Sequence, residues 1–135
     1  MIVVDVNVVA YFFIEGDKTM LARDLMRKDP HWRLPSLWRH EFLDVLAAFV
    51  RHGGATIAEG KALWRKTIGL LTSHEQIVDM EAALILASEN RISAYDGQYI
   101  ALARQLQTVC VTEDKRLLRT FPDLTCAMRA YVAES

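Results

Sequence analysis

The first five residues of the chain constrain its fold more than any other stretch. Residues 1–4 are apolar, Ile2, Val3 and Val4 are β-branched, and Asp5 follows them directly. A short apolar run of this kind is typical of a parallel strand that is buried on both faces. Open α/β sheets bind ligands beyond the carboxyl ends of their strands, so Asp5 is predicted to lie at a ligand-binding edge.

Strand and helix patterns alternate along the rest of the chain. Further strands are expected at 32–34, 76–78, 108–112 and 124–126. Helices are expected at 8–14, at 18–28 with Asp17 as N-cap, at 37–52, from a Thr56/Glu59 capping box to about 71, at 80–90 after Asp79, at 95–107 and at 114–120. This alternation predicts βαβ units, and hence an α/β fold with a mostly parallel sheet and helices on both faces.

Composition agrees with one folded domain spanning 1–135. Hydrophobic residues make up 52% and charged residues 24% of the 135, which excludes a disordered chain. Cys110 and Cys126 lack C-x-x-C spacing, and we interpret them as reduced thiols of a cytoplasmic protein. We expect no membrane span and no signal peptide, since no apolar run approaches the roughly 20 residues of a span and no basic segment precedes one.

Two acids stand out in the first third of the chain. Asp5 is the first polar side chain, and it is equally readable as the N-cap of the following helix. Glu41 lies four residues after Leu37 and four before Val45, on the apolar stripe of its predicted helix. A carboxylate in such a position is costly to bury unless it is paired or binds a cation, so Glu41 indicates either a site or an internal salt bridge.

Two later acids have similar settings. Asp96 falls on the same helical face as Tyr99 and Ile100, although a first-turn acid favoured by the helix dipole is an equal alternative. Asp114 follows the strand at 108–112 by two residues and is also readable as an N-cap, while Thr112 adds a hydroxyl at the same edge.

Together the four carboxylates indicate a metal site. Four acids at one place would raise one another's pKa unless a cation neutralised them. All-oxygen ligands select Mg²⁺ or Mn²⁺ over zinc, and such ions suit phosphodiester hydrolysis. No Ser/His/Asp or Cys/His arrangement competes, and the four histidines are expected to be solvated: His31, His40, His52 and His74.

The motifs in order resemble those of the PIN-domain family, and more narrowly the VapC-type toxins of toxin–antitoxin pairs. They are Val-Val-Asp-Val-Asn-Val at the start, Glu41 in a helix that opens Pro-Ser-Leu-Trp, Ala-Tyr-Asp-Gly-Gln-Tyr-Ile-Ala-Leu-Ala around Asp96, and Val-Thr-Glu-Asp-Lys-Arg-Leu around Asp114. The resemblance covers the whole chain and implies a three-layer, Rossmann-like α/β/α sandwich.

The resemblance also implies an activity. It implies that the chain is a metal-dependent endoribonuclease whose Mg²⁺ or Mn²⁺ site consists of Asp5, Glu41, Asp96 and Asp114. Asn7 and Thr112 match the family's polar residues that orient carboxylates or water. The family further implies a homodimer and a small cognate antitoxin, for which the helices at 8–14 and 38–49 are candidate surfaces, although plain core is an equal interpretation.

The charge of the chain does not itself indicate a nucleic-acid binder. The formal net charge is −1, whereas such proteins more often carry a basic surplus. If RNA is the substrate, basic residues gather on one face or bound cations offset the acids. Candidate phosphate contacts, each equally a solvated surface charge, are Arg39, Arg51, Lys115, Arg116 and Arg119.

Other functions fit less well. Asp5-Val6-Asn7-Val8 is similar to the opening of a haloacid-dehalogenase-like phosphatase, in which Asp5 would be a nucleophile, but Asn7 replaces the second acid. A receiver domain likewise needs an acid pair after its first strand. A catalytically silent PIN-like domain that binds RNA or a partner is the alternative outside enzymes.

Overall fold

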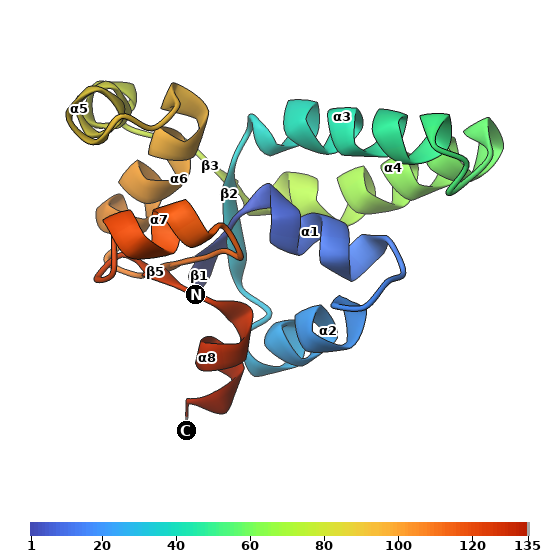
Figure 1. Ribbon diagram of the computed structural model, residues 1–135, viewed down its shortest axis with the longest axis horizontal. Helices are drawn as coiled ribbons and strands as arrows, with labels where there is room; N and C mark the ends of the chain where they lie inside the picture. Colours follow the sequence, from blue (N-terminus) through green and yellow to red (C-terminus); the bar gives the residue numbers. More distant parts are fainter. Residues whose placement is uncertain (135) are drawn as a thin grey trace.

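The computed structural model describes residues 1–134, and its centre is a five-stranded sheet (Figure 1). The strands are β1 (Ile2–Val4), β2 (Trp32–Pro35), β3 (Glu75–Gln76), β4 (Cys110–Val111) and β5 (Thr125–Cys126). They lie in the order β3-β2-β1-β4-β5, and all four neighbouring pairs are parallel. The predicted α/β class is therefore confirmed.

Helices connect the strands. They are α1 (Val6–Phe13), α2 (Thr19–Lys28), α3 (Trp38–Arg51), α4 (Ile57–Leu71), α5 (Met80–Asn90), α6 (Ala94–Gln105), α7 (Lys115–Thr120) and α8 (Met128–Ala133), with a 3₁₀ turn at Thr72–His74. Figure 1 shows α3 and α4 side by side, extending away from the sheet. None of the helices in residues 1–134 is both long and apolar enough to cross a membrane.

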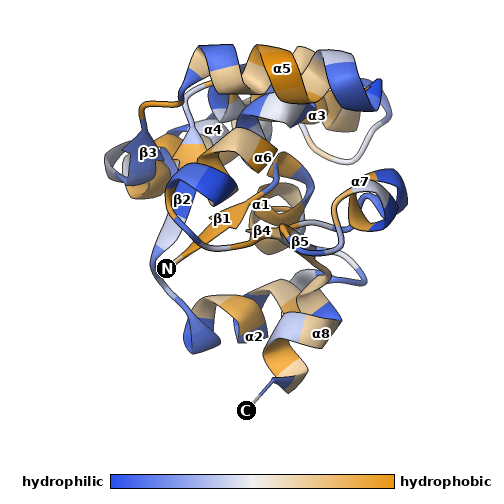
Figure 2. Ribbon diagram, turned by 90° about the vertical axis from the view of Figure 1, so that its left-hand side faces the viewer, coloured by the Kyte–Doolittle hydropathy of each residue, from blue (hydrophilic) through white to orange (hydrophobic). Residues whose placement is uncertain are grey.

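Side chains of β1 alternate between the two faces of the sheet, as the strand's pleat requires. Ile2 and Val4 are fully buried in a core with residues from α1, α2, α3, α4 and α8. Val3, also fully buried, joins a second core formed with α5, α6 and α7. Helices thus cover both faces, which explains why the opening strand is apolar at every position; Figure 2 shows β1 as a hydrophobic strand in the interior.

The strand order places a topological switch point beside β1. The chain proceeds from β1 to β2 and β3 on one side, and then returns to β4 and β5 on the other. The backbone N–H of Asp5 donates to the carbonyl of Val111 at 3.0 Å, so Asp5 and Thr112 leave the sheet side by side. Crevices beyond the carboxyl ends of strands at such points are where open α/β sheets bind ligands.

Gly97 permits the close packing of α5 on α6. A Cβ atom at this position would lie 2.8 Å from the backbone oxygen of Ala83 and 3.5 Å from the Cβ of Ala87. Only a residue without a side chain fits here without a shift of one helix. Because Gly97 follows Asp96, this contact also fixes the first turn of α6 against α5.

Most predicted elements are confirmed within a few residues, and three details were wrong. Asp17 does not cap α2, because the N-cap is Lys18 and no side chain caps that end. His74 is not simply solvated: it is half-buried, and its Nδ1 lies 2.8 Å from the Trp32 carbonyl oxygen. Helix α8 had not been predicted.

Candidate active site

Asp5 lies at the carboxyl end of β1 and is only 5% exposed. One carboxylate oxygen, Oδ1, accepts from the backbone N–H of Val6 at 2.7 Å, so Asp5 is the N-cap of α1. The other oxygen, Oδ2, accepts from the Thr112 hydroxyl at 2.7 Å. Asp5 is therefore both a helix cap and a buried carboxylate at the strand edge, and the two sequence interpretations are compatible.

Asn7 and Thr112 connect Asp5 to the end of β4. The Asn7 side-chain amide lies 3.4 Å from Asp5 Oδ2 and 3.3 Å from the Thr112 hydroxyl oxygen. The Thr112 hydroxyl also accepts from the backbone N–H of Asp114 at 3.1 Å. Asp114 Oδ1 in turn accepts from the backbone N–H groups of Arg116 and Leu117 in the first turn of α7, at 2.9 and 3.0 Å. These bonds hold four of the predicted site residues in one network.

Glu41 lies in the first turn of α3 and is half-buried. Its Oε1 accepts a 2.7 Å hydrogen bond from the hydroxyl of Tyr99, which is fully buried in α6. Burial raises the pKa of the Tyr99 hydroxyl well above its ordinary value of 10.0, so this group stays protonated and donates. Glu41 is thus held by a phenol and not by the internal salt bridge that the sequence allowed.

Asp96 lies in the first turn of α6, where Ser93 is the N-cap. The Ser93 hydroxyl accepts from the backbone N–H of Asp96 at 3.0 Å. The capping position is therefore taken by Ser93, and the half-buried carboxylate of Asp96 is left without a capping role.

Burial and neighbouring carboxylates change the pKa of Asp5, Glu41 and Asp96. Burial raises the pKa of Asp5 from 3.8 to about 6, against the lowering effect of its hydrogen bonds, and the charges of Asp96 and Asp114 raise it further. Burial likewise raises the pKa of Glu41 from 4.5 to about 7, and the Asp5 and Asp96 charges add to this rise. The pKa of Asp96 is raised by burial and by Asp114.

No basic side chain neutralises these acids by direct contact. Within residues 1–134, none of the four forms an ion pair, although the charge of Arg116 partly offsets the rise in the pKa of Asp96. In the same part of the chain, no hydrogen bond reaches Glu41 Oε2 or Asp114 Oδ2, whereas a side-chain hydrogen bond from Ser93 lowers the pKa of Asp96. Unshared oxygens are therefore available on Glu41 and Asp114.

The described residues contain no group of three His, Cys, Asp or Glu side chains close enough to hold a metal ion together. The donor chemistry nevertheless fits a hard cation, because the set is all-oxygen, partly desolvated and mutually repelling. Mg²⁺ keeps several of its waters and commonly uses one or two carboxylates, so it does not require three converged side chains.

Comparison with known proteins decides the family. The PIN-domain family model matches residues 2–121, which include all four acids. The chain belongs to the PIN-domain family. Among solved structures, the crystal structure of PAE2754 from Pyrobaculum aerophilum matches with a TM-score of 0.76 and 17% identity, over 96% of this chain and 92% of that one. This likeness shows the shared fold. No curated protein matches the sequence.

PIN domains are generally nucleases that act on RNA or other nucleic acid and use divalent metal ions. The predicted family and fold are thereby confirmed. The assignment of Asp5, Asn7, Glu41, Asp96, Thr112 and Asp114 as this PIN domain's site residues stays a prediction.

Sequence reasoning missed Tyr99 and Ser93. Tyr99 falls in the quoted motif around Asp96, on the same face, but its position suggested only core packing. Its bond to Glu41 joins residues 58 apart in sequence, and no local pattern predicts such a contact. Ser93 carried a readable signal, since Ser followed three residues later by an acid is typical of a helix start.

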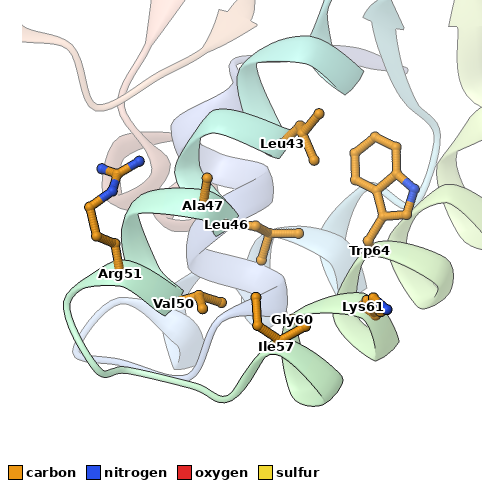
Figure 3. Close-up of a pocket in the computed structure, with 9 residues that line it drawn as sticks. All are labelled: Leu43, Leu46, Ala47, Val50, Arg51, Ile57, Gly60, Lys61 and Trp64. Atoms are coloured by element: carbon orange, nitrogen blue, oxygen red, sulfur yellow. The ribbon is translucent and has the colours of Figure 1, made fainter.

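An apolar groove of this PIN domain lies between α3 and α4, and the four acids are not among the residues that line it. It has a volume of about 490 Å³ and is lined by Leu43, Leu46, Ala47, Val50, Arg51, Ile57, Gly60, Lys61 and Trp64 (Figure 3). Leu43 and Ile57 are 52% and 63% exposed. An open apolar surface of this kind is suited to a protein contact rather than to hydrolysis.

Proposed function

We propose that this PIN domain is a metal-dependent endoribonuclease, the toxin of a type II toxin–antitoxin pair, formed by one domain over 1–135. One observation carries the proposal. Burial and neighbouring carboxylates raise the pKa of Asp5, Glu41 and Asp96, which lie with Asp114 around the carboxyl ends of β1 and β4, yet none of the four, within residues 1–134, has a basic partner in an ion pair. A site that is unfavourable when empty is suited to a cation.

Asp5 and at least one of the other three acids would hold Mg²⁺, with Mn²⁺ as a substitute, and water would complete its ligands. When bound, the ion supplies charge for the phosphate and an activated water for hydrolysis. The chain's own residues orient the ligands. Thr112 and Asn7 fix the Asp5 carboxylate, and Tyr99 fixes one oxygen of Glu41 while the second oxygen stays unshared.

Basic residues beside the site support an RNA substrate. Lys115, Arg116 and Arg119 belong to α7, which begins directly after Asp114, and Lys115 and Arg119 are exposed. Arg39, another candidate, is less available because its guanidinium makes hydrogen bonds of 2.6 and 2.7 Å to Glu75. The basic residues of α7 are therefore better candidates than Arg39 for contacts with the RNA phosphate backbone.

Exposed apolar surfaces support the proposed protein partners. The groove between α3 and α4 suits a cognate antitoxin. The helix at 38–49, most of α3, was predicted from the sequence as a candidate surface for that partner. A second apolar surface on α5 suits a homodimer, because Met80, Leu84 and Ile85 are each more than half exposed. Contiguous apolar patches of this kind mark interfaces.

The direct test compares wild type with Asp5→Asn on single-stranded and structured RNA, with Mg²⁺, with Mn²⁺ and with a chelator. We expect cleavage only in wild type and only with metal. Asp123→Asn is the matched control, since Asp123 is exposed and forms no hydrogen bond within residues 1–134, and it should cut normally. Cleavage in the chelator, or by Asp5→Asn at the wild-type rate, contradicts the proposal.

RNA binding, RNA cleavage and phosphate release by the same protein distinguish the proposal from the two alternative functions. A silent RNA-binding PIN domain would bind RNA in every condition and never cut it. A haloacid-dehalogenase-like phosphatase would release phosphate from a small phosphate ester and leave RNA intact.

A further inference from the structure

A pocket of about 440 Å³ adjoins the candidate active site and is distinct from the apolar groove. Its lining consists of Leu37, His40, Glu41, Asp44 and Tyr95. Four of these residues lie at the start of α3 or just before it, and Tyr95 lies in the first turn of α6. The pocket shares Glu41 with the four acids, and Tyr95 is the neighbour of Asp96 in the chain. The pocket is therefore within reach of a substrate bound at the acids.

Tyr95 is unusually placed for an aromatic residue. It is 63% exposed, whereas Tyr99, one turn later in the same helix, is fully buried. Among residues 1–134, the Tyr95 ring pairs with no other aromatic ring and its hydroxyl forms no hydrogen bond. An exposed aromatic face beside a phosphodiester site is a platform on which an unpaired base can stack.

The polar lining selects what can enter. The exposed carboxylate of Asp44 offers acceptors, Glu41 adds a second carboxylate, and His40 is the only cationic candidate in the lining. Phosphate groups are repelled by such a lining, so the part of the substrate that fits is a base that presents donors. Guanine presents an imino and an amino donor side by side, which match the two oxygens of one carboxylate. Uracil presents one donor flanked by two carbonyls.

We propose that this pocket is a nucleobase subsite of the ribonuclease, in which Tyr95 stacks an unpaired base next to the scissile phosphate and Asp44 selects guanine by its donor edge. The inference rests on the proposed function for the identity of the substrate. It names a specificity-determining pair, Tyr95 and Asp44, outside the four acids.

Binding of short single-stranded RNA tests this subsite separately from catalysis. The full chain carrying Asp5→Asn is titrated, with Mg²⁺ present, into labelled uridine heptamers whose central base is guanine, adenine, cytosine or uracil. We expect the guanine strand to bind about tenfold more tightly than the uracil strand. Adding Tyr95→Ala should weaken guanine-strand binding about tenfold, whereas Tyr95→Phe should retain it. Adding Asp44→Asn should remove most of the guanine preference.

Met20→Ala is the matched control, because Met20 is 63% exposed on α2 and does not line the pocket. Equal binding of the four strands, no detectable binding of any of them, or unchanged binding by Tyr95→Ala overturns the subsite. Displacement of the RNA by an arginine-bearing peptide that Tyr95→Ala no longer binds would assign the pocket to a protein partner and also overturn it. Wild-type cleavage without these binding effects would refute the subsite and leave the proposed function standing.

Discussion

Replacement of Asp5 by Asn should stabilise the metal-free protein at neutral pH. The folded state raises the pKa of this carboxyl from 3.8 to about 6. One pKa unit corresponds to about 1.36 kcal/mol, so ionised Asp5 costs the folded state about 3 kcal/mol. Between pH 3.8 and about pH 6, Asp5 keeps its proton in the folded chain and has lost it in the unfolded chain. Stability therefore falls as pH rises through this interval, and the full cost applies above it.

Asn keeps the shape of the side chain and is a good N-cap, so the bond from Val6 to Oδ1 can persist. We therefore expect the free energy of unfolding of Asp5→Asn to exceed that of wild type by about 1–3 kcal/mol at about pH 8, and the difference to approach zero at about pH 4. The lower bound allows for loss of the 2.7 Å hydrogen bond that Oδ2 accepts from the Thr112 hydroxyl, and for the poorer fit of an amide beside the Asn7 amide, 3.4 Å from Asp5 Oδ2.

Urea denaturation of both proteins in a chelator, at the two pH values, measures this difference. Asp123→Asn should leave the free energy of unfolding unchanged at both pH values. An Asp5→Asn protein that is less stable than wild type at the higher pH would refute the reasoning, as would a difference that does not depend on pH. Adding Mg²⁺ should then stabilise wild type and not the variant, because ligands that bind only the folded state stabilise it.

Four further predictions concern the same site and the stability of the helices. In wild type, the affinity for Mg²⁺ should rise with pH through about 6 to 7, where Asp5 and Glu41 ionise in the metal-free protein; a flat pH–affinity profile there contradicts this. Tyr99→Phe removes a hydrogen bond that lowers the pKa of Glu41, so the profile should move to higher pH by up to about one unit; an unmoved profile contradicts the role of the phenol. Gly97→Ala should lower the free energy of unfolding by about 1–3 kcal/mol, because its Cβ would lie 2.8 Å from a backbone oxygen of α5. Gly69→Ala, with no atom within 4 Å of its Cβ among the described residues, should instead stabilise α4 by up to about 1 kcal/mol in thermal or urea denaturation.

The sequence predicted those parts of the fold that depend on local patterns. The β-branched run at 2–4 identified the central strand because it is buried on both faces. The capping box of Thr56 and Glu59 is present with both of its hydrogen bonds, since it involves only neighbouring residues. Glu41 was recognisable because a carboxylate interrupts an apolar stripe.

Contacts between distant segments were not predictable from such patterns. The pairing of Tyr99 with Glu41 depends on how α6 packs against α3, and a tyrosine on an apolar face gives no sign of its hydrogen-bond partner. The half-buried His74 likewise contacts a distant segment, because its Nδ1 lies 2.8 Å from the carbonyl oxygen of Trp32 in β2. Helix α8 is short, and only Met128 among its residues is fully buried, so its apolar pattern is weak.

The central claim is that Asp5, Glu41, Asp96 and Asp114 hold a divalent ion. Anomalous diffraction from crystals of the full chain soaked in Mn²⁺ tests it most directly. The account predicts a manganese peak whose ligands include a carboxylate oxygen of Asp5 and of at least one of the other three acids, completed by water. A crystal of active protein in which manganese is bound elsewhere, and these four carboxylates contact no ion, would contradict it.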